Sequence, residues 1–217
     1  MIRVYILNTD RLSDESIFEL IDTLPFGEAE KTRLLAINNS KHKRESLGGL
    51  LALSRLLDKC CADTSGFSTE IIRSPSGKPY FNSPNAPYFG ISHSQGVAAA
   101  AIVDCKYGEI GFDVELVNEQ YDFMRIAERY FDGNERAELE RNGNSALSFF
   151  SLWTAKEARA KIDGRGLSAL LSDKSKSISD GIFLTRLCVE VGDRQAVLSV
   201  CSYVAGQSVQ IYKDKDI

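Results

Sequence analysis

The sequence predicts an α+β protein made of two similar halves. Each half opens on a β-prone segment, continues through amphipathic helices and returns to strands, and no low-complexity linker separates the halves. The order begins again near residues 105–108, so we expect an N-terminal half at residues 1–106 and a C-terminal half at residues 107–217. A chain of 217 residues, 43% of them hydrophobic, is long enough to bury a core of this kind.

The N-terminal half alternates between the period-2 pattern of strands and the 3.6-residue pattern of helices. Ser13 is placed to cap the first helix and Pro25 to end it. Proline, serine, glycine and asparagine gather between residues 74 and 87, which indicates loops. The expected elements are a strand at 2–7, helices at 13–24, 27–37 and 43–59, and strands at 88–92 and 97–103.

The C-terminal half repeats this order. Its first strand carries two acidic residues, and the alternation in its tail is typical of an antiparallel meander. The expected elements are a strand at 110–115, helices at 122–130, 133–142 and 145–162, and strands at 182–191, 196–204 and 208–212.

Composition excludes several classes of protein. A net charge of -4 gives no general reason to expect a nucleic-acid partner, although residues 41–44 are locally basic. The longest small-apolar run, residues 97–103, is too short to cross a membrane, and the chain opens on a strand rather than a signal peptide. The five cysteines include no Cys-x-x-Cys pair, which argues against a disulfide framework and against a thiolate zinc site. We therefore expect a cytoplasmic protein that binds neither membranes nor nucleic acid.

Asp113 and Glu115 are the first candidate site residues. Successive side chains of a strand point to opposite faces, so these two carboxylates share one face of the segment 110–115. They could form half of a metal site. An ordinary solvated strand face explains the same alternation equally well.

Glu157 and Lys161 lie downstream on a predicted helix. Three- and four-residue steps place them on one stripe with Phe150 and Trp153, which brings charged groups onto an aromatic face. A Glu–Lys pair at this spacing is also the ordinary helix-stabilising arrangement. The aromatic stripe favours the first interpretation, because an exposed pair normally lies opposite the core.

Together the three carboxylates indicate a hard cation. Asp113, Glu115 and Glu157 offer oxygen ligands, and we expect no usable cluster of histidine and cysteine, so Mg²⁺ or Mn²⁺ is the predicted metal. Mg²⁺ often takes phosphate oxygens as its remaining ligands. The nearby cations would neutralise a polyanion, and the predicted ligand is a metal-bound pyrophosphate. These cations are Lys156, Lys161 and Arg165.

Three further positions have two interpretations each. Arg44 falls in the first turn of its helix, where a cation opposes the helix dipole, so it either binds an anion or is simply solvated. His93 is either a ligand or a structural histidine. The turn containing Lys78 is either part of a site or a surface loop.

Four short blocks follow one another along the chain. They are Gly77-Lys78-Pro79, Ile91-Ser92-His93-Ser94, Gly111-Phe112-Asp113-Val114-Glu115, and Trp153-x-x-Lys156-Glu157-x-x-x-Lys161 with Gly164-Arg165-Gly166-Leu167. Each block alone is weak, but the order and spacing of all four are specific. Together they resemble the motifs of 4'-phosphopantetheinyl transferases of the surfactin-synthetase-activating (Sfp) type, and the resemblance runs from about Lys31 to Leu167.

The resemblance implies a monomer in which a pseudo-two-fold axis relates the two α/β halves and coenzyme A, the co-substrate, binds between them. It implies that the three carboxylates hold Mg²⁺ on the pyrophosphate and that other side chains bind the phosphates. Those expected at the coenzyme A site are Lys31 as an outer contact, Arg44, Lys78 and His93 at the 3'-phosphate, Gly77 and Pro79 in the same turn, Ser92 at a phosphate, and Lys156 and Lys161 at the pyrophosphate.

The implied reaction transfers phosphopantetheine to a serine of an apo acyl or peptidyl carrier protein and releases 3',5'-ADP. Glu157 is the expected base, and Lys161 would stabilise the leaving group. Two other functions use the same residues differently: a Mg²⁺-dependent phosphodiester hydrolase acting on coenzyme A, and a non-catalytic module that binds coenzyme A or a carrier protein.

Carrier proteins of this kind are acidic around their serine, so we look for the docking surface near the helix 121–130. Its apolar residues either contact the carrier or form the core face of the helix, and for at least half of them the core is the favoured interpretation. They are Phe123, Met124, Ile126 and Tyr130.

Overall fold

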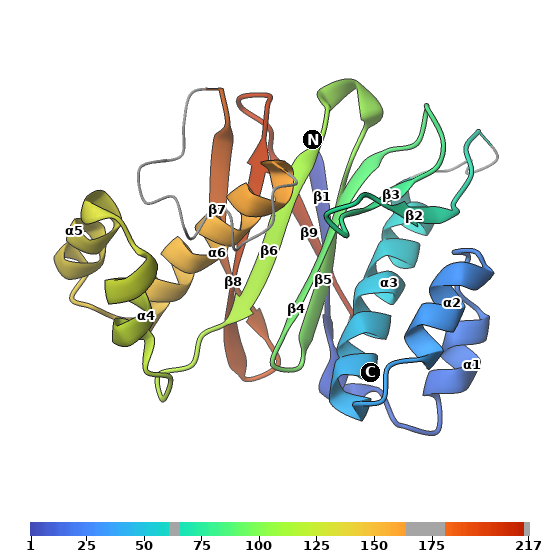
Figure 1. Cartoon of the computed structure of the whole chain (residues 1–217), viewed down its shortest axis with the longest axis horizontal. Coiled ribbons are helices and arrows are strands. Elements are labelled where there is room, and N and C mark those ends of the chain that lie inside the picture. Colours follow the sequence, from blue (N-terminus) through green and yellow to red (C-terminus); the bar gives the residue numbers. More distant parts are fainter. Residues whose placement is uncertain (61–65, 164–180, 215–217) are drawn as a thin grey trace.

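The structure is a computed structural model that describes residues 1–60, 66–163 and 181–214. It has a mixed α+β fold in which helices flank two β-sheets (Figure 1). The strands are β1 (Ile2–Asn8), β2 (Ile71–Arg73), β3 (Pro79–Phe81), β4 (Tyr88–Ser94), β5 (Val97–Val103), β6 (Ile110–Leu116), β7 (Phe183–Val191), β8 (Arg194–Ser202) and β9 (Val209–Lys213). The α-helices are α1 (Ile17–Asp22), α2 (Glu28–Leu35), α3 (Ser40–Cys60), α4 (Phe123–Tyr130), α5 (Gly133–Arg141) and α6 (Ala146–Asp163), with short 3₁₀ turns at Thr9–Arg11 and Cys105–Tyr107.

Hydrogen bonds define two main sheets and one hairpin. The first sheet has the order β4-β5-β1-β9, the second has the order β6-β8-β7, and β2 pairs with β3. Strands β4 and β5, β5 and β1, and the three strands of the second sheet are antiparallel neighbours. The predicted strands and helices are therefore present, with ends that shift by a few residues.

The expected antiparallel meander in the tail is wrong for its last strand. Strands β7 and β8 pair as predicted, but β9 leaves them and pairs in parallel with β1, with Val4 opposite Ile211. Alternation along a strand fixes which side chains share a face, but it does not fix the partner strand. The C-terminal tail thus completes the sheet whose other strands come from residues 2–103.

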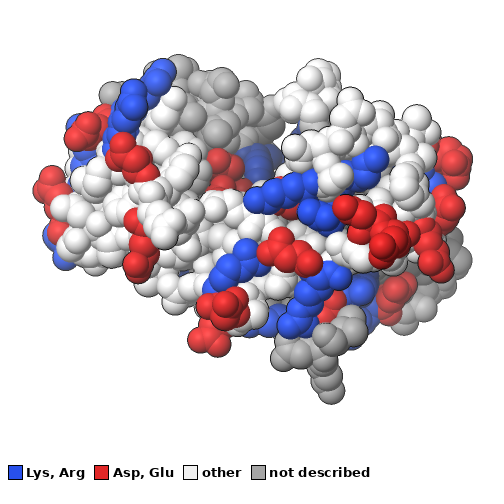
Figure 2. All heavy atoms as spheres, turned by 90° about the horizontal axis from the view of Figure 1, so that it is seen from below, with Lys and Arg blue, Asp and Glu red and all other residues white. Residues whose placement is uncertain are grey.

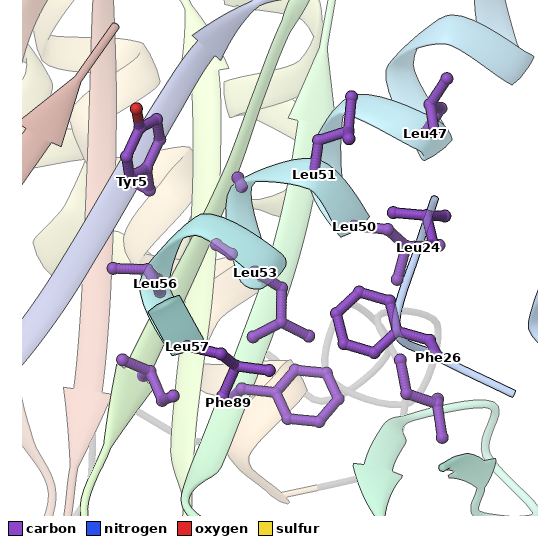
Figure 3. Close-up of a cluster of buried hydrophobic side chains, with 14 of the residues drawn as sticks. Tyr5, Leu24, Phe26, Leu47, Leu50, Leu51, Leu53, Leu56, Leu57 and Phe89 are labelled. Atoms are coloured by element: carbon purple, nitrogen blue, oxygen red, sulfur yellow. The ribbon is translucent and has the colours of Figure 1, made fainter. Parts of the chain in front are cut away.

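Helix α3 covers one face of the first sheet. Its buried leucines pack with Tyr5, Phe26 and Phe89 to form the core shown in Figure 3. Asn39 caps the helix, because its Oδ1 accepts a hydrogen bond from the backbone N–H of His42 at 2.9 Å. The cap explains why α3 begins three residues earlier than the leucine stripe alone predicts.

The opposite face of the first sheet shares a core with the second. Val4 and Ala99 of the first sheet and Phe112 and Leu198 of the second belong to one cluster of buried residues. On β6 the apolar side chains enter this shared core, so the alternate positions, including Asp113, face away from it.

Strand β6 also contacts helix α6 at very short range. A Cβ atom added to Gly111 would lie 1.9 Å from the carbonyl oxygen of Ala158, so only glycine permits this approach. On its other side β6 runs beside β4, where a Cβ on Gly90 would lie 2.7 Å from the Cβ of Phe112. These two glycines bring β4, β6 and α6 together, as Figure 1 shows near the middle of the molecule.

Charge is mixed on the surface. On the face seen in Figure 2, lysine and arginine are interspersed with aspartate and glutamate rather than gathered by sign. Within residues 1–60, 66–163 and 181–214, no helix has both the length and the apolarity needed to cross a bilayer.

Candidate active site

The carboxylates of Asp113, Glu115 and Glu157 meet where β6 faces α6. Each of the three offers an oxygen that lies within 4.8 Å of the others. Asp113 is 1% exposed, and its Oδ1 accepts hydrogen bonds from Ser92 at 2.7 Å and from Lys161 at 2.6 Å. The strand face and the helix stripe predicted separately therefore form one cluster.

Strand β4 supplies two hydroxyl groups to this cluster. The hydroxyl of Ser92 bonds to Asp113, and the hydroxyl of Ser94 donates to Glu115. The Nζ of Lys161 also lies 3.0 Å from the Ser92 hydroxyl and 3.9 Å from a carboxylate oxygen of Glu157. The cluster thus joins β4 to β6 and α6.

Burial and mutual repulsion perturb these acids. Burial, followed by the negative charge of Asp113, raises the pKa of Glu115 to about 7 and that of Glu157 to about 8. Burial alone would lower the pKa of Lys161, but the facing carboxylates, Asp113 foremost, raise it above its ordinary value. Lys161 is therefore a cation fixed beside three acids, and two of these, Glu115 and Glu157, have raised pKa values.

The cluster fits a hard divalent cation. Asp113 has a second oxygen, Oδ2, that is buried and has no hydrogen-bond partner among the described residues. A buried carboxylate oxygen normally has a hydrogen-bond donor or a cation as its partner, and a metal ion could be that partner here. Because all three side chains offer only oxygen, the site suits Mg²⁺ or Mn²⁺.

Two cavities adjoin the cluster and share Glu157 and Lys161 in their walls. The first encloses about 300 Å³, and the second, about 280 Å³, lies under the turn that contains Lys78. The first is lined by Glu30, Arg33, His42, Ser46, Leu50, Arg73, Pro79, Ile91, Ser92, His93, Asp113, Glu115, Glu157 and Lys161. The second is lined by Ser76, Gly77, Lys78, Pro79, Phe89, Gly90, Ile91, Ile110, Phe112, Glu157, Ala160 and Lys161.

Most of the predicted phosphate ligands line these cavities. Ser92 and His93 belong to the first cavity, and Gly77, Lys78 and Pro79 contribute to the second. The ammonium of Lys78 is paired with Glu109 at 2.6 Å. Its side chain is nevertheless placed at the cavity wall.

Three predicted cations are not brought into this cluster. Arg44 pairs with Asp14 at 2.8 Å, and Lys31 lies 3.4 Å from Glu28. Lys156 is buried on another side of α6, where its Nζ lies 3.0 Å from Glu135 of α5. The predicted Gly164–Leu167 block, including Arg165, lies outside the described residues.

Sequence reasoning missed two arginines in the first cavity. The buried carboxylate of Glu30 holds Arg33 at 2.7 Å and Arg73 at 2.8 Å. The Glu30–Arg33 pair could have been found from its three-residue spacing on a helix. Arg73 joins them from a strand, 43 residues from Glu30 in the sequence, and no local pattern predicts that contact.

The expectation that no histidine cluster is usable is wrong. His42 and Glu45 of α3 and His93 of β4 offer ligand atoms within 4.8 Å of one another. The two imidazole rings are 5.3 Å apart, and the Nδ1 of His93 lies 3.4 Å from Glu45. Burial lowers the pKa of His93, an effect that Glu45 only partly offsets. The contact was missed because 48 residues separate Glu45 from His93 in the sequence.

Comparison with known proteins shows what this chain is similar to. Residues 109–206 match the family model of the 4'-phosphopantetheinyl transferase superfamily, a span that includes β6 and α6. The 4'-phosphopantetheinyl transferase AcpT of Salmonella typhi is 27% identical over 146 residues, 66% of this chain and 71% of that protein. The transferase gsp of Aneurinibacillus migulanus is 27% identical over 169 residues (77% and 68%), and psf-1 of Bacillus pumilus is 30% identical over 139 residues (63% and 52%).

These alignments are longer than either half of the chain, and the family match contains the three carboxylates and Lys161. The motifs, the mixed α+β fold and these relatives agree in their similarity to the 4'-phosphopantetheinyl transferase superfamily.

Proposed function

We propose that this protein transfers 4'-phosphopantetheine from coenzyme A to a serine of an apo acyl or peptidyl carrier protein and releases 3',5'-ADP. The relatives carry the name of this activity. The observation that carries the proposal is the carboxylate cluster with Lys161, which borders a cavity that also contains two arginines and two histidines. A polyanionic substrate needs both kinds of group: oxygens to hold its metal and cations to hold its phosphates.

Asp113, Glu115 and Glu157 would hold the metal, Mg²⁺ or Mn²⁺. When bound there, it would offset the charge of the pyrophosphate and of the leaving oxygen. Ser92 and Ser94 orient two of the carboxylates through their hydroxyls, which leaves the buried Oδ2 of Asp113 available. The hydroxyls thus keep the cluster ordered.

Glu157 and Lys161 would handle the proton and the developing charge. Glu157 would accept the proton of the attacking serine, which requires its carboxylate to be ionised. Lys161 would donate to the oxygen of the leaving 3',5'-ADP. Hydrogen bonds to Asp113 and Ser92 already hold its ammonium beside the carboxylate cluster.

The first cavity offers a place for the 3'-phosphate. Glu30 fixes the guanidinium groups of Arg33 and Arg73 at its wall, and His93 lines the same cavity. Lys78 in the neighbouring wall supplies a further cation. If Lys31, Arg44 or Lys156 also contact coenzyme A, each must first leave the carboxylate that it now pairs with.

We place coenzyme A between two halves, residues 1–106 and 107–217, that are related by a pseudo-two-fold axis. Support comes from the carboxylate cluster, which joins β4 of the first half to β6 and α6 of the second.

We also propose that the protein acts as a monomer in the cytoplasm. A single chain supplies every group named above, so a monomer suffices. Cys60, Cys105 and Cys188 carry free thiols, which suits the reducing cytoplasm.

Helix α4 is the proposed carrier-docking element. Phe123 and Ile126 pack into the core beside α6, and the ring of Tyr130 lies 6.0 Å from that of Trp153. Tyr121 and Met124 are exposed, as are Arg125 and Arg129 of the same helix. Exposed apolar and basic side chains together suit an acidic carrier surface.

A single incubation tests the function. The chain is mixed with coenzyme A, Mg²⁺ and an apo carrier protein, and the carrier mass and the remaining coenzyme A are both measured. A mass gain of one phosphopantetheine supports the transferase. Consumption of coenzyme A without a mass gain would identify a hydrolase, and no change in either would leave a binding module.

A further inference from the structure

His42, Glu45 and His93 form a cluster of metal-ligating groups separate from the three carboxylates. His42 and Glu45 are three residues apart on α3 and therefore share one face of the helix. His93 joins them from β4, where it pairs with Ala98 of β5. The ligand atoms already lie within 4.8 Å of one another.

The scaffold fixes each of these side chains on a regular element. The cap by Asn39 holds the backbone at His42, and the Oε1 of Glu45 accepts a hydrogen bond from the backbone N–H of Gly96 at 2.8 Å. That second contact orients the carboxylate while its Oε2 faces His93. Partners of this kind commonly orient the ligands of metal sites.

The carboxylate of Glu45 is buried beside the imidazoles of His42 and His93. It is only 8% exposed, and no lysine or arginine among the described residues lies within 4 Å of its carboxylate. Its hydrogen-bonded and ion-pair partners are a backbone amide and an imidazole. A buried carboxylate without a cation is costly, and a bound metal ion would remove that cost.

We propose that His42, Glu45 and His93 bind a divalent ion of the zinc class, at a site distinct from the Mg²⁺ site. Two imidazoles and one carboxylate are a recurring set of three protein ligands for zinc, with water in the remaining position. Mg²⁺ prefers oxygen ligands and would not compete well here. Both histidines line the first cavity, so this ion would lie near the proposed 3'-phosphate site.

The test is zinc binding without coenzyme A or carrier protein. Metal-free protein is dialysed against low zinc in a large excess of Mg²⁺, which occupies the oxygen site, and bound zinc is counted by elemental analysis. We expect one zinc per chain for the unmodified protein and none for His42→Ala at the same free zinc. Because His42 is exposed, this variant should fold, and circular dichroism checks that it does.

Two control variants locate the ion. Lys41→Ala changes an exposed neighbour in the same helical turn, and Glu157→Gln changes the oxygen site; both should retain zinc. With Co²⁺ in place of zinc, the visible absorption of a tetrahedral ion should appear and be lost with His42→Ala. The proposal is overturned if the unmodified protein binds no zinc, if His42→Ala binds it equally well, or if only Glu157→Gln loses it. None of these results depends on transferase activity.

Discussion

Asp113 is the residue that links β4, β6 and α6 within the site. One of its oxygens is hydrogen-bonded to both Ser92 and Lys161, while the other has no partner within the described part of the chain. Burial, followed by the negative charge of Asp113, raises the pKa values of Glu115 and Glu157. Asp113 therefore both positions Lys161 and leaves an oxygen for a cation.

Replacing Glu157 by Gln should slow transfer about 100-fold or more, because the amide cannot accept the proton of the serine and is a weaker metal ligand. Initial rates at saturating Mg²⁺ measure the effect. Glu140→Gln, an exposed change on α5, is the matched control and should leave the rate unchanged. Near-normal transfer by Glu157→Gln would remove Glu157 from the role of base.

The raised pKa values of Glu115 and Glu157 predict how stability depends on pH. In the metal-free protein the folded state holds these protons more tightly than the unfolded state, whose carboxyls titrate near 4.5. The stabilisation is complete below that value and is lost as the pH rises through about 7 and 8. The free energy of unfolding in EDTA should therefore fall between about pH 5 and pH 8.

Urea denaturation at the two pH values measures this fall. Added Mg²⁺ should restore stability at the higher pH, because it binds only the folded state. The double variant Glu115→Gln/Glu157→Gln should show a smaller fall. An unchanged fall in that variant would assign the pH dependence to other groups.

Among the secondary-structure elements, the contact between β6 and α6 determines how close Glu157 lies to Asp113 and Glu115. Gly111 permits it, because any side chain there would meet the carbonyl of Ala158. Helix α6 is also fixed at Thr154, whose hydroxyl lies 2.8 Å from that of Ser199 on β8. The helix position that places Glu157 over Asp113 thus depends on a glycine outside the chemistry.

Gly111→Ala should destabilise the protein by about 3 kcal/mol, because the helix must move away from the strand. Chemical denaturation measures the loss. Gly133→Ala is the control, since a Cβ there would meet nothing within 4 Å, and its effect should stay within about 0.5 kcal/mol. Equal stabilities of the two variants would show that the close approach is not needed.

The elements were largely predictable from sequence because their signals are local. Hydrophobic periodicity located α3, α6 and β6, and the two-residue skip placed Asp113 and Glu115 on one face. The pairing of β9 with β1 was not predictable, because alternation leaves the partner strand open. The same limit explains Arg73 and Glu45, which reach the site through contacts between distant segments.

In the molecule as a whole, the first cavity is lined by groups of both charges. The three carboxylates come from β6 and α6, and Arg33 and Arg73 come from α2 and β2. A ligand with a metal-bound pyrophosphate and a separate phosphate would use both kinds of group. The lining therefore suits the proposed substrate, coenzyme A.

Arg73→Ala should weaken binding of coenzyme A about tenfold, because it removes a charged hydrogen-bond donor to the 3'-phosphate. The affinity for 3'-dephospho-coenzyme A should hardly change, and calorimetry of both ligands measures the difference. Arg141→Ala, an exposed change on α5, controls for net charge. Equal losses for the two ligands would place the 3'-phosphate elsewhere.

We propose that three carboxylates from β6 and α6 support metal-dependent transfer of phosphopantetheine to a carrier serine. The most direct measurement is the mass of an apo carrier protein after incubation with this chain and coenzyme A, with Mg²⁺ or with excess EDTA. We predict a gain of one phosphopantetheine with Mg²⁺, no gain with EDTA, and almost none with Asp113→Asn. A carrier whose mass stays unchanged with Mg²⁺, or rises equally in EDTA, would contradict the claim.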